Sequence, residues 1–358
     1  MVSLLYDLYH SFLSPGSFIL RMAMNAERAY IRNLRYLVQT GFLGLTLFIG
    51  YRFYHFVLHF ESPGHLFVDR PPSVDAFLPI AGLMSLKYFL FTGIVEPVHP
   101  AALVIFVAVI AVSLLLKKGF CGWICPIGTL SQGFWMAGER LFGRNFRIEK
   151  YTDISLRSIK YLLMGLFIIL IGVAMMPNMM VLFFLTDYYK TADVRTMKFF
   201  TEMSGTVVWF LLGMGGLSLV FKNVWCRYLC PYGALLGLLS IISPVRISRN
   251  EEKCMHCHAC SRNCPSLIDV EKQEMVTSPE CFGCLTCVSR CPSRGALDVT
   301  VKAGKKRNPF RPYLYPIILI AGFYLIIGAG MIAGKWRSQV PYDEYGRIIP
   351  GLSQSQNP

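Results

Sequence analysis

Cysteine spacing is the most informative chemical feature of this chain. Eight of its twelve cysteines form two runs with the spacing C-x2-C-x2-C-x3-C-P. The runs are Cys254, Cys257, Cys260 and Cys264, followed by Pro265, and Cys281, Cys284, Cys287 and Cys291, followed by Pro292. In bacterial ferredoxins, thiolates with this spacing hold [4Fe–4S] clusters. The runs therefore predict two [4Fe–4S] clusters.

The predicted ligand sets are crossed, because the fourth cysteine of each run ligates the cluster of the other run. We expect cluster 1 on Cys254, Cys257, Cys260 and Cys291, and cluster 2 on Cys281, Cys284, Cys287 and Cys264. Gly283 would let the backbone approach the inorganic core, whereas His256 and His258 are interpreted as exposed loop residues. Zinc is the alternative metal for these cysteines, but zinc sites usually consist of two separated pairs of ligands.

The other four cysteines belong to an internal repeat. Lys117–Leu130 closely resembles Lys222–Leu235, and each copy contains C-x3-C-P directly after an apolar segment. Two such pairs on the same membrane face would supply four thiolates, which suit an iron–sulfur cluster or a soft metal such as Cu(I). The hypothesis is one shared metal centre, a third iron–sulfur cluster, on Cys121, Cys125, Cys226 and Cys230. A redox dithiol, a copper site and a purely structural role are the alternatives.

Composition indicates that a membrane positions these motifs. Hydrophobic residues make up 54% of the 358 residues and charged residues only 16%, whereas soluble domains carry about 25% charged residues. Five apolar stretches approach the ~20 residues needed to cross a bilayer. They are Leu37–Leu58, Ala101–Leu116, Ile159–Met176, Val207–Phe221 and Tyr313–Ala333.

Basic residues orient the five predicted spans. Clusters such as Arg21–Arg35, Lys117–Lys118 and Lys302–Arg311 all fall on one side if the N-terminus is inside and the C-terminus outside. The positive-inside rule makes that side cytoplasmic. The net charge of +14 is then mostly loop charge beside membrane lipid, and nucleic acid is not expected as a partner. We therefore predict a multi-pass protein of the bacterial inner membrane.

Two apolar segments are not interpreted as spans. Ala76–Gly93 must begin and end outside, which predicts an interfacial or re-entrant helix; a sixth span is the alternative. Leu4–Leu20 lacks the pattern of a secretory signal and is interpreted as an amphipathic surface helix.

The predicted fold is an α-helical integral membrane protein with an inserted α+β ferredoxin domain containing two [4Fe–4S] clusters. The predicted divisions are an interfacial segment (1–36), a transmembrane core (37–243), the ferredoxin domain (244–311), the last span (312–334) and a periplasmic tail (335–358).

Histidines near the outer boundary offer a weaker pattern. His55, His59 and His99 could face a quinol or haem, but interfacial histidines in an aromatic belt are the preferred interpretation. Glu96 and Asp187 invite a proton-transfer role, yet solvated carboxylates at helix ends are more common. Motifs for covalent haem, nucleotide phosphates and dinucleotides are absent from the sequence.

Taken together, these motifs resemble those of the polyferredoxin membrane proteins of the NapH and NosR kind. The resemblance covers about Leu37–Ala333 and rests on paired C-x3-C-P motifs followed by two ferredoxin runs. It implies electron transfer between the quinone pool or a cytoplasmic donor and a periplasmic respiratory metalloenzyme system, of the nitrate or nitrous oxide reductase type, together with redox partner proteins. NosR-like proteins carry an outer flavin domain, whereas here about 36 residues precede the first span.

Two other functional classes stay open. The chain could be a copper-handling or oxidase assembly factor that uses its thiols and clusters to reduce or deliver copper. It could also be a structural anchor within a larger redox complex. In none of these classes does the sequence predict a stand-alone enzyme, and it identifies no catalytic residue.

Overall fold

The computed structural model describes residues 15–62, 64–303 and 306–354. Its helices and helical turns are α2 (Pro15–Glu61), η1 (Pro72–Phe77), α3 (Pro79–Thr92), α4 (Pro100–Leu115), α5 (Gly119–Trp123), α6 (Pro126–Phe142), α7 (Lys150–Phe167), η2 (Ile168–Ala174), α8 (Pro177–Phe184), α9 (Asp187–Lys190), α10 (Ala192–Thr201), α11 (Gly205–Val220), η3 (Trp225–Leu229), α12 (Pro231–Leu239), η4 (Ser240–Ile242), α13 (Ala259–Arg262), α14 (Thr286–Ser289), α15 (Leu314–Ile332) and α16 (Tyr342–Gln354). The strands are β1 (Val245–Arg249), β2 (Leu297–Ala303) and β3 (Lys306–Phe310).

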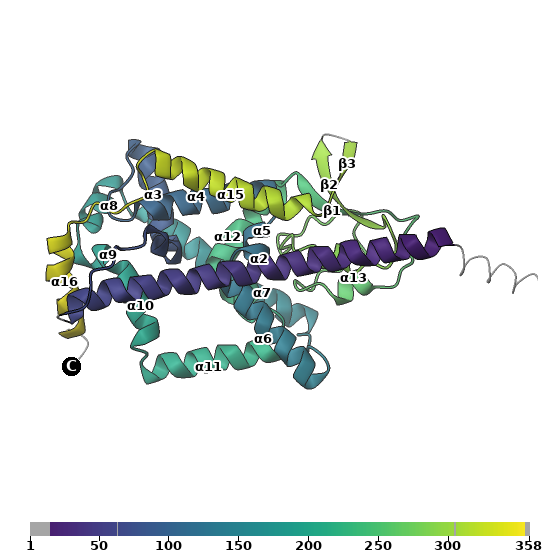
Figure 1. Ribbon diagram of the computed structural model, residues 1–358, viewed down its shortest axis with the longest axis horizontal. Coiled ribbons are helices and arrows are strands. Elements are labelled where there is room, and N and C mark those ends of the chain that lie inside the picture. Colours follow the sequence, from purple (N-terminus) through teal and green to yellow (C-terminus); the bar gives the residue numbers. More distant parts are fainter. Residues whose placement is uncertain (1–14, 63, 304–305, 355–358) are drawn as a thin grey trace, which may run out of the picture.

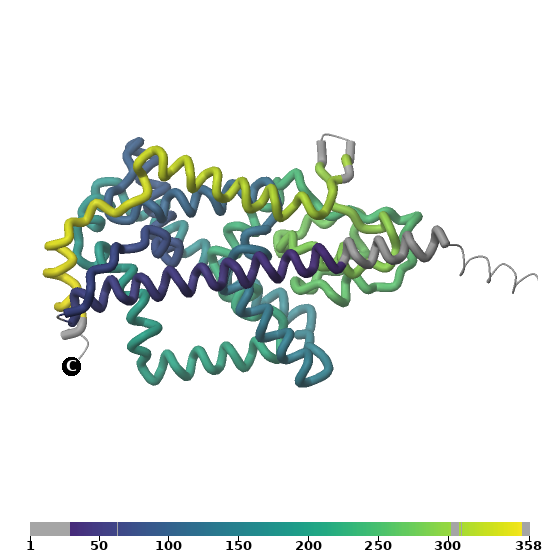
Figure 2. The backbone as a smooth tube through the Cα atoms, viewed as in Figure 1, coloured from purple at the N-terminus to yellow at the C-terminus, as the bar shows by residue number. Residues whose placement is uncertain are grey.

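The molecule is elongated, and its two ends differ in structure. Helices α2 and α15 run along the long axis (Figure 1). The three strands and α13 lie at one end, whereas α8, α9 and α16 lie at the other. We call these the cysteine-rich end and the opposite end. The tube view shows that α2 and α15 each connect the two ends (Figure 2).

Three described helices are long and apolar enough to cross a membrane. They lie within α2 (Ala29–Glu61), across α7 and η2 (Lys150–Ala174), and in α15 (Leu314–Ile332). A fourth candidate is the pair α10 and α11, which is bent by 76° at its break. The predicted first span begins at Leu37, but α2 already begins at Pro15. The predicted surface helix Leu4–Leu20 lies mostly outside the described residues.

The second predicted span forms the centre of the helical body. Helix α4 has only 16 residues, about 24 Å of helix, which is less than the ~30 Å of a hydrocarbon core. Eleven of those residues are buried, and α4 packs against α3, α12 and α15. Its apolar sequence therefore faces protein on most sides. The segment Ala76–Gly93 contains the end of η1 and the 14-residue α3, which packs on α4.

The third predicted span changes its helical geometry near its end. The last part, η2, is a π-helix, which redirects backbone carbonyls from their usual partners. The Lys87 ammonium of α3 donates hydrogen bonds to the carbonyl oxygens of Ile171, at 2.9 Å, and Met175. A lysine thus supplies hydrogen bonds to carbonyl oxygens at this helix end, which apolar side chains cannot do.

The strands form one antiparallel sheet in the order β1-β2-β3. Val245 pairs with Val301 and Arg249 with Leu297, while Val299 pairs with Phe310. Helices α13 and α14 contact each other beside this sheet, and α14 also contacts β2. The buried side chains of this region include Cys260, Cys264, Cys287 and Cys291, which share one core with α4 and α15.

Candidate iron–sulfur sites

Two cavities in the cysteine-rich end are each lined by four cysteines. One contains Cys254, Cys257 and Cys260 together with Cys291. The other contains Cys281, Cys284 and Cys287 together with Cys264. In each cavity, three thiols come from one run and the fourth from the other. None of these eight described cysteines forms a disulfide. These are the two crossed sets that the spacing predicts, and their number and chemistry fit a [4Fe–4S] cluster in each cavity.

The two runs share one backbone conformation. In both runs, the residues on either side of the second cysteine have a left-handed backbone. The φ angles are 51° and 58° at His256 and His258, and 59° and 57° at Gly283 and Leu285. Alternating conformations of this kind turn successive N–H groups inward, which favours a bound anion. Gly283 has a second constraint, since a Cβ there would lie 2.0 Å from the Tyr315 hydroxyl. Packing against Tyr315 therefore requires glycine at this position for a reason that the sequence did not predict.

The four C-x3-C-P cysteines also lie together, although they come from distant segments. Cys226 is buried, and its thiol interacts electrostatically with those of Cys121, Cys125 and Cys230. Burial raises the pKa of Cys125 to about 11, and the nearby Cys230 adds to this. Thiols with raised pKa values are mostly protonated at neutral pH. A bound cation would stabilise their deprotonated form.

Each C-x3-C-P motif bridges the end of one helix and the start of the next. Pro126 and Pro231 are the first residues of α6 and α12, so the second cysteine of each motif is the N-cap. The Gly233 amide donates a 3.2 Å hydrogen bond to Cys230 Sγ. N–H groups at a helix N-terminus stabilise a thiolate. In the first copy glycine is needed for packing, since a Cβ on Gly128 would lie 2.3 Å from the Cys121 carbonyl oxygen.

The first C-x3-C-P motif is in direct contact with the second ferredoxin run. A Cβ on Gly122 would lie 2.7 Å from the Phe282 carbonyl oxygen and 3.5 Å from Cys284 Cβ. Cys226, Phe282 and Cys284 form one buried cluster, against which Cys121 packs. The C-x3-C-P thiols are therefore neighbours of the second ferredoxin cavity.

Polar side chains that the sequence analysis missed hold this contact together. Arg35 of α2 donates hydrogen bonds to the Gly122 carbonyl oxygen at 3.1 Å and to Thr286 Oγ1 at 2.8 Å. Gln39, one turn later, donates to the same Gly122 oxygen at 3.0 Å. The spacing of Arg35 and Gln39 places both on one helix face, but only packing reveals what that face contacts.

Buried charges surround the same region. The Lys160 ammonium lies 2.7 Å from both carboxylate oxygens of Glu280, and Lys118 lies 3.9 Å from it. Burial works to raise the pKa of Glu280, but the two ammonium groups outweigh burial and lower it. On the second copy of the repeat, Arg227 forms a two-point ion pair with Asp153, with both distances 2.8 Å.

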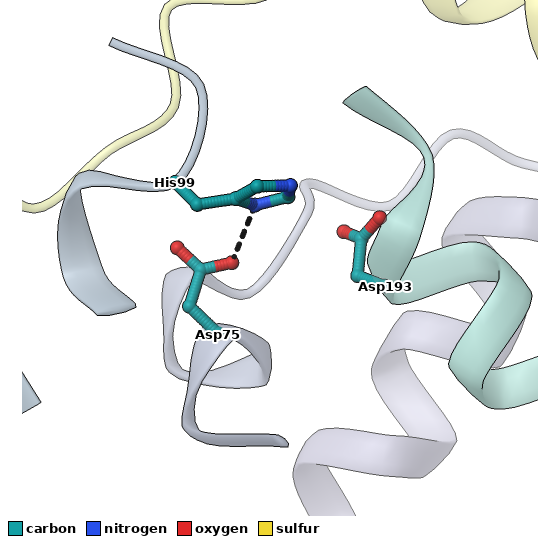
Figure 3. Close-up of side chains that lie close together, drawn as sticks. All are labelled: Asp75, His99 and Asp193. Atoms are coloured by element: carbon teal, nitrogen blue, oxygen red, sulfur yellow. Dashed lines mark hydrogen bonds and ion pairs between the residues drawn. The ribbon is translucent and has the colours of Figure 1, made fainter. Parts of the chain in front are cut away.

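A second buried charged network lies at the opposite end (Figure 3). His99 Nδ1 lies 3.0 Å from Asp75 Oδ1, and His99 Nε2 lies 2.9 Å from the Tyr189 carbonyl oxygen. The ligand-capable atoms of Asp75, His99 and Asp193 lie within 4.8 Å of one another. However, Arg70 forms ion pairs with both carboxylates, so its guanidinium already supplies the cation that they need. We assign no metal ion to this network.

The outer histidines and carboxylates separate into different environments. His99 is fully buried, so its interpretation as an interfacial histidine is wrong. His55 contacts the rings of Tyr51 and Tyr54, as an aromatic belt predicts, and His59 hydrogen-bonds to the Tyr342 hydroxyl at 2.7 Å.

The two outer carboxylates also differ. Glu96 is fully buried and accepts from the His99 amide at 2.7 Å, so its interpretation as a solvated carboxylate is wrong. The Asp187 side chain is 61% exposed. His256 and His258 are exposed as predicted, and both lie beside Glu271.

Comparison with known protein families agrees with this geometry. A family model described as a 4Fe-4S binding domain matches residues 98–149 and 205–250, the two segments that contain the C-x3-C-P motifs. A second, described as a 4Fe-4S dicluster domain, matches residues 246–292, which contain both ferredoxin runs. No solved structure matches the chain.

Individual relatives point the same way. YccM of Escherichia coli (strain K12), whose name assigns it to electron transport, is 41% identical over 86% of this chain and 87% of its own. The ferredoxin-type protein NapH of Escherichia coli (strain K12) is 26% identical over 75% of this chain and 88% of its own. The regulatory protein NosR of Stutzerimonas stutzeri is 24% identical over 62% of this chain and 30% of its own. The chain thus belongs to the NapH/NosR-type polyferredoxin family, the 4Fe–4S membrane proteins of electron transport.

Proposed function

We propose that this protein conducts electrons along three adjacent cysteine sites, from the two ferredoxin cavities to the four C-x3-C-P thiols at the membrane surface. Each site would hold a [4Fe–4S] cluster, which takes up and releases one electron when bound. The chain's own residues hold the sites in order. The crossed cysteines Cys264 and Cys291 link the two cavities, and Gly122 and Phe282 bring the third site against the second.

One observation carries this proposal: the contact between the Cys121 turn and the Phe282–Cys284 loop. A site that only anchored the helices would have no need to adjoin a ferredoxin cavity. Buried apolar groups between the sites also exclude water, which favours electron transfer over reaction with solvent. The copper-handling function would instead require the four thiols to be reached by a metal donor, yet Cys226 is buried.

We place the cysteine-rich end in the cytoplasm and the opposite end in the periplasm of a bacterial inner membrane. Support comes from the basic groups Lys117–Lys118 and Arg227, which lie beside the cysteine sites. The connected reactions would be oxidation of a quinol or a cytoplasmic donor and reduction of a periplasmic respiratory metalloenzyme system, as the family resemblance implies. The nitrate and nitrous oxide systems are the proposed classes.

Quantification of iron and acid-labile sulfide in the full-length, detergent-purified protein tests the three-site proposal. Three clusters predict about twelve irons per chain, and Cys226→Ser should lower this to about eight. Cys254→Ser should cause a similar loss but remove a different paramagnetic resonance signal. About eight irons in both the unmodified protein and Cys226→Ser would contradict the proposal. Tight Cu(I) binding that disappears in Cys226→Ser, without a change in iron, would favour the copper function.

A further inference from the structure

A buried group of three charges lies beside the C-x3-C-P thiols. Its members are Lys118, Lys160 and Glu280, whose side chains are 1%, 0% and 6% exposed. Lys160 forms a close ion pair with Glu280, whereas Lys118 lies farther from it, at 3.9 Å. Two ammonium groups thus share one carboxylate, which leaves about one positive charge without a compensating partner in this group.

The Lys118 ammonium is held by the elements that border the thiols. It donates a 3.2 Å hydrogen bond to the carbonyl oxygen of Gly233, the residue whose amide donates to Cys230 Sγ. It also lies 4.9 Å from the centre of the Phe282 ring, and Phe282 packs with Cys226. The Lys118 ammonium is therefore held between the first turn of α12 and the Phe282 loop, which faces the second C-x3-C-P motif.

The internal repeat supplies this charge only once. The position of Lys118 in the first copy corresponds to Asn223 in the second. Asn223 is neutral, and it donates a 3.0 Å hydrogen bond to the Pro265 carbonyl oxygen. Of the two cations in the second copy, Arg227 is neutralised by Asp153, and the Lys222 ammonium lies over the Trp135 ring. The uncompensated positive charge therefore lies on one side of the pseudo-symmetric thiol set.

We propose that Lys118 and Lys160, opposed by Glu280, set the reduction potential of the C-x3-C-P site. This inference rests on the proposed function, because it requires a redox centre on the four thiols. Reduction adds one electron to a site that is already negative, and neither a bond nor a proton changes. A buried ammonium stabilises the added charge strongly, since the interior screens it less than water does. The two lysines therefore raise the potential, and Glu280 lowers it.

Potentiometric titration followed by paramagnetic resonance tests this assignment on the full-length protein. The signal of the C-x3-C-P site is identified as the one that Cys226→Ser removes. Lys118→Met should make this site harder to reduce, with a roughly tenfold fall in the reduced-to-oxidised ratio at a fixed potential, or about 59 mV for one electron. Glu280→Gln should shift the potential in the opposite direction. The signal that Cys254→Ser removes should keep its potential in both variants.

The matched control is Lys222→Met. Lys222 is also a buried lysine of the repeat, but its ammonium lies over the Trp135 ring, at 4.7 Å. The potential of the C-x3-C-P site should stay unchanged in this variant. Equal shifts in Lys118→Met and Lys222→Met, or no shift in either Lys118→Met or Glu280→Gln, would overturn the proposal.

Iron content separates this inference from the proposed function. About twelve irons in the unmodified protein, with an unshifted potential in Lys118→Met and Glu280→Gln, would refute the lysine assignment and leave the three-site function standing. About eight irons in the unmodified protein would refute both. If Lys118→Met loses iron, Glu280→Gln decides: a rise in potential supports the assignment, and an unchanged or lower potential refutes it.

Discussion

Trp123 Nε1 donates a 3.0 Å hydrogen bond to the carbonyl oxygen of Gly283. The bond joins the first C-x3-C-P turn to the loop that carries Cys281 and Cys284. Both residues are buried, and the Trp123 ring also packs against Tyr315 of α15. One side chain thus connects a repeat motif, a ferredoxin loop and the last candidate span, which makes the relative position of the two cysteine sites rigid.

Replacing Trp123 with Phe should weaken this connection. The ring volume is largely kept, but the buried Gly283 oxygen loses its donor, which costs about 1–3 kcal/mol. We expect earlier unfolding in a chemical denaturant, measured by loss of the visible absorption of the clusters. Trp135→Phe is the control, because Trp135 Nε1 has no hydrogen-bond partner among the described residues. Equal destabilisation by both substitutions would argue that ring packing, not the hydrogen bond, matters.

Crossed ligation predicts which cysteine substitutions behave alike. Cys291 lies in the second run but lines the cavity of Cys254, Cys257 and Cys260. Cys291→Ser and Cys254→Ser should therefore alter the same paramagnetic resonance signal, and Cys264→Ser should alter the signal that Cys281→Ser alters. Paired spectra of the four variants check this. Cys291→Ser matching Cys281→Ser instead would show that each run holds its own cluster.

The ion pair between Arg227 and Asp153 should be important for stability. Its atoms are nearly buried, with side chains 6% and 11% exposed, and removing one partner from a buried pair typically costs about 3–5 kcal/mol. Asp153→Asn should lower the thermal unfolding midpoint clearly. Arg157→Gln is the control: Arg157 binds the same carboxylate at 2.9 Å but is 28% exposed, so its loss should cost about 1 kcal/mol or less. A midpoint unchanged in Asp153→Asn would contradict this.

The network at the opposite end predicts a pH dependence of stability. Burial acts to lower the pKa of His99, but the Asp75 carboxylate outweighs it and raises the pKa. A raised pKa in the folded state means that protonated His99 contributes its full stabilisation below the unfolded value of about 6.5. That stabilisation is lost as pH rises through the folded-state pKa. The unfolding midpoint should therefore decrease as the pH rises above about 6.5, the unfolded value.

His99→Gln should flatten this part of the profile, measured as the unfolding midpoint against pH. His65→Gln is the matched control because His65 is exposed, and it should keep the dependence of the unmodified protein. A slope retained in His99→Gln would mean that another group titrates in this range.

Much of the cysteine chemistry was predictable because chelation by neighbouring residues is a local property. The spacing within each run and the proline that follows it are readable along the chain, whereas the left-handed conformation also occurs at His256, His258 and Leu285, where no glycine marks it. Helix positions were also predictable, as α11 and α15 begin within two residues of the expected starts. The beginning of α2 was not, because charged residues such as Arg32 and Arg35 continue a helix as readily as apolar ones.

What the sequence by itself determined is the kind of ligand, the number of thiols per set and the apolar segments near them, since residue type and short spacing decide these. Only the tertiary structure decided which distant groups meet: Arg35 with Thr286, Lys160 with Glu280, and Arg70 with Asp193. The physical reason is that a buried charge needs a partner group. The packing of the helices decides which group that is, and the separation of the two groups along the sequence does not. The same packing places in the interior Glu96, which was expected in solvent, and His99, which was expected at the membrane interface.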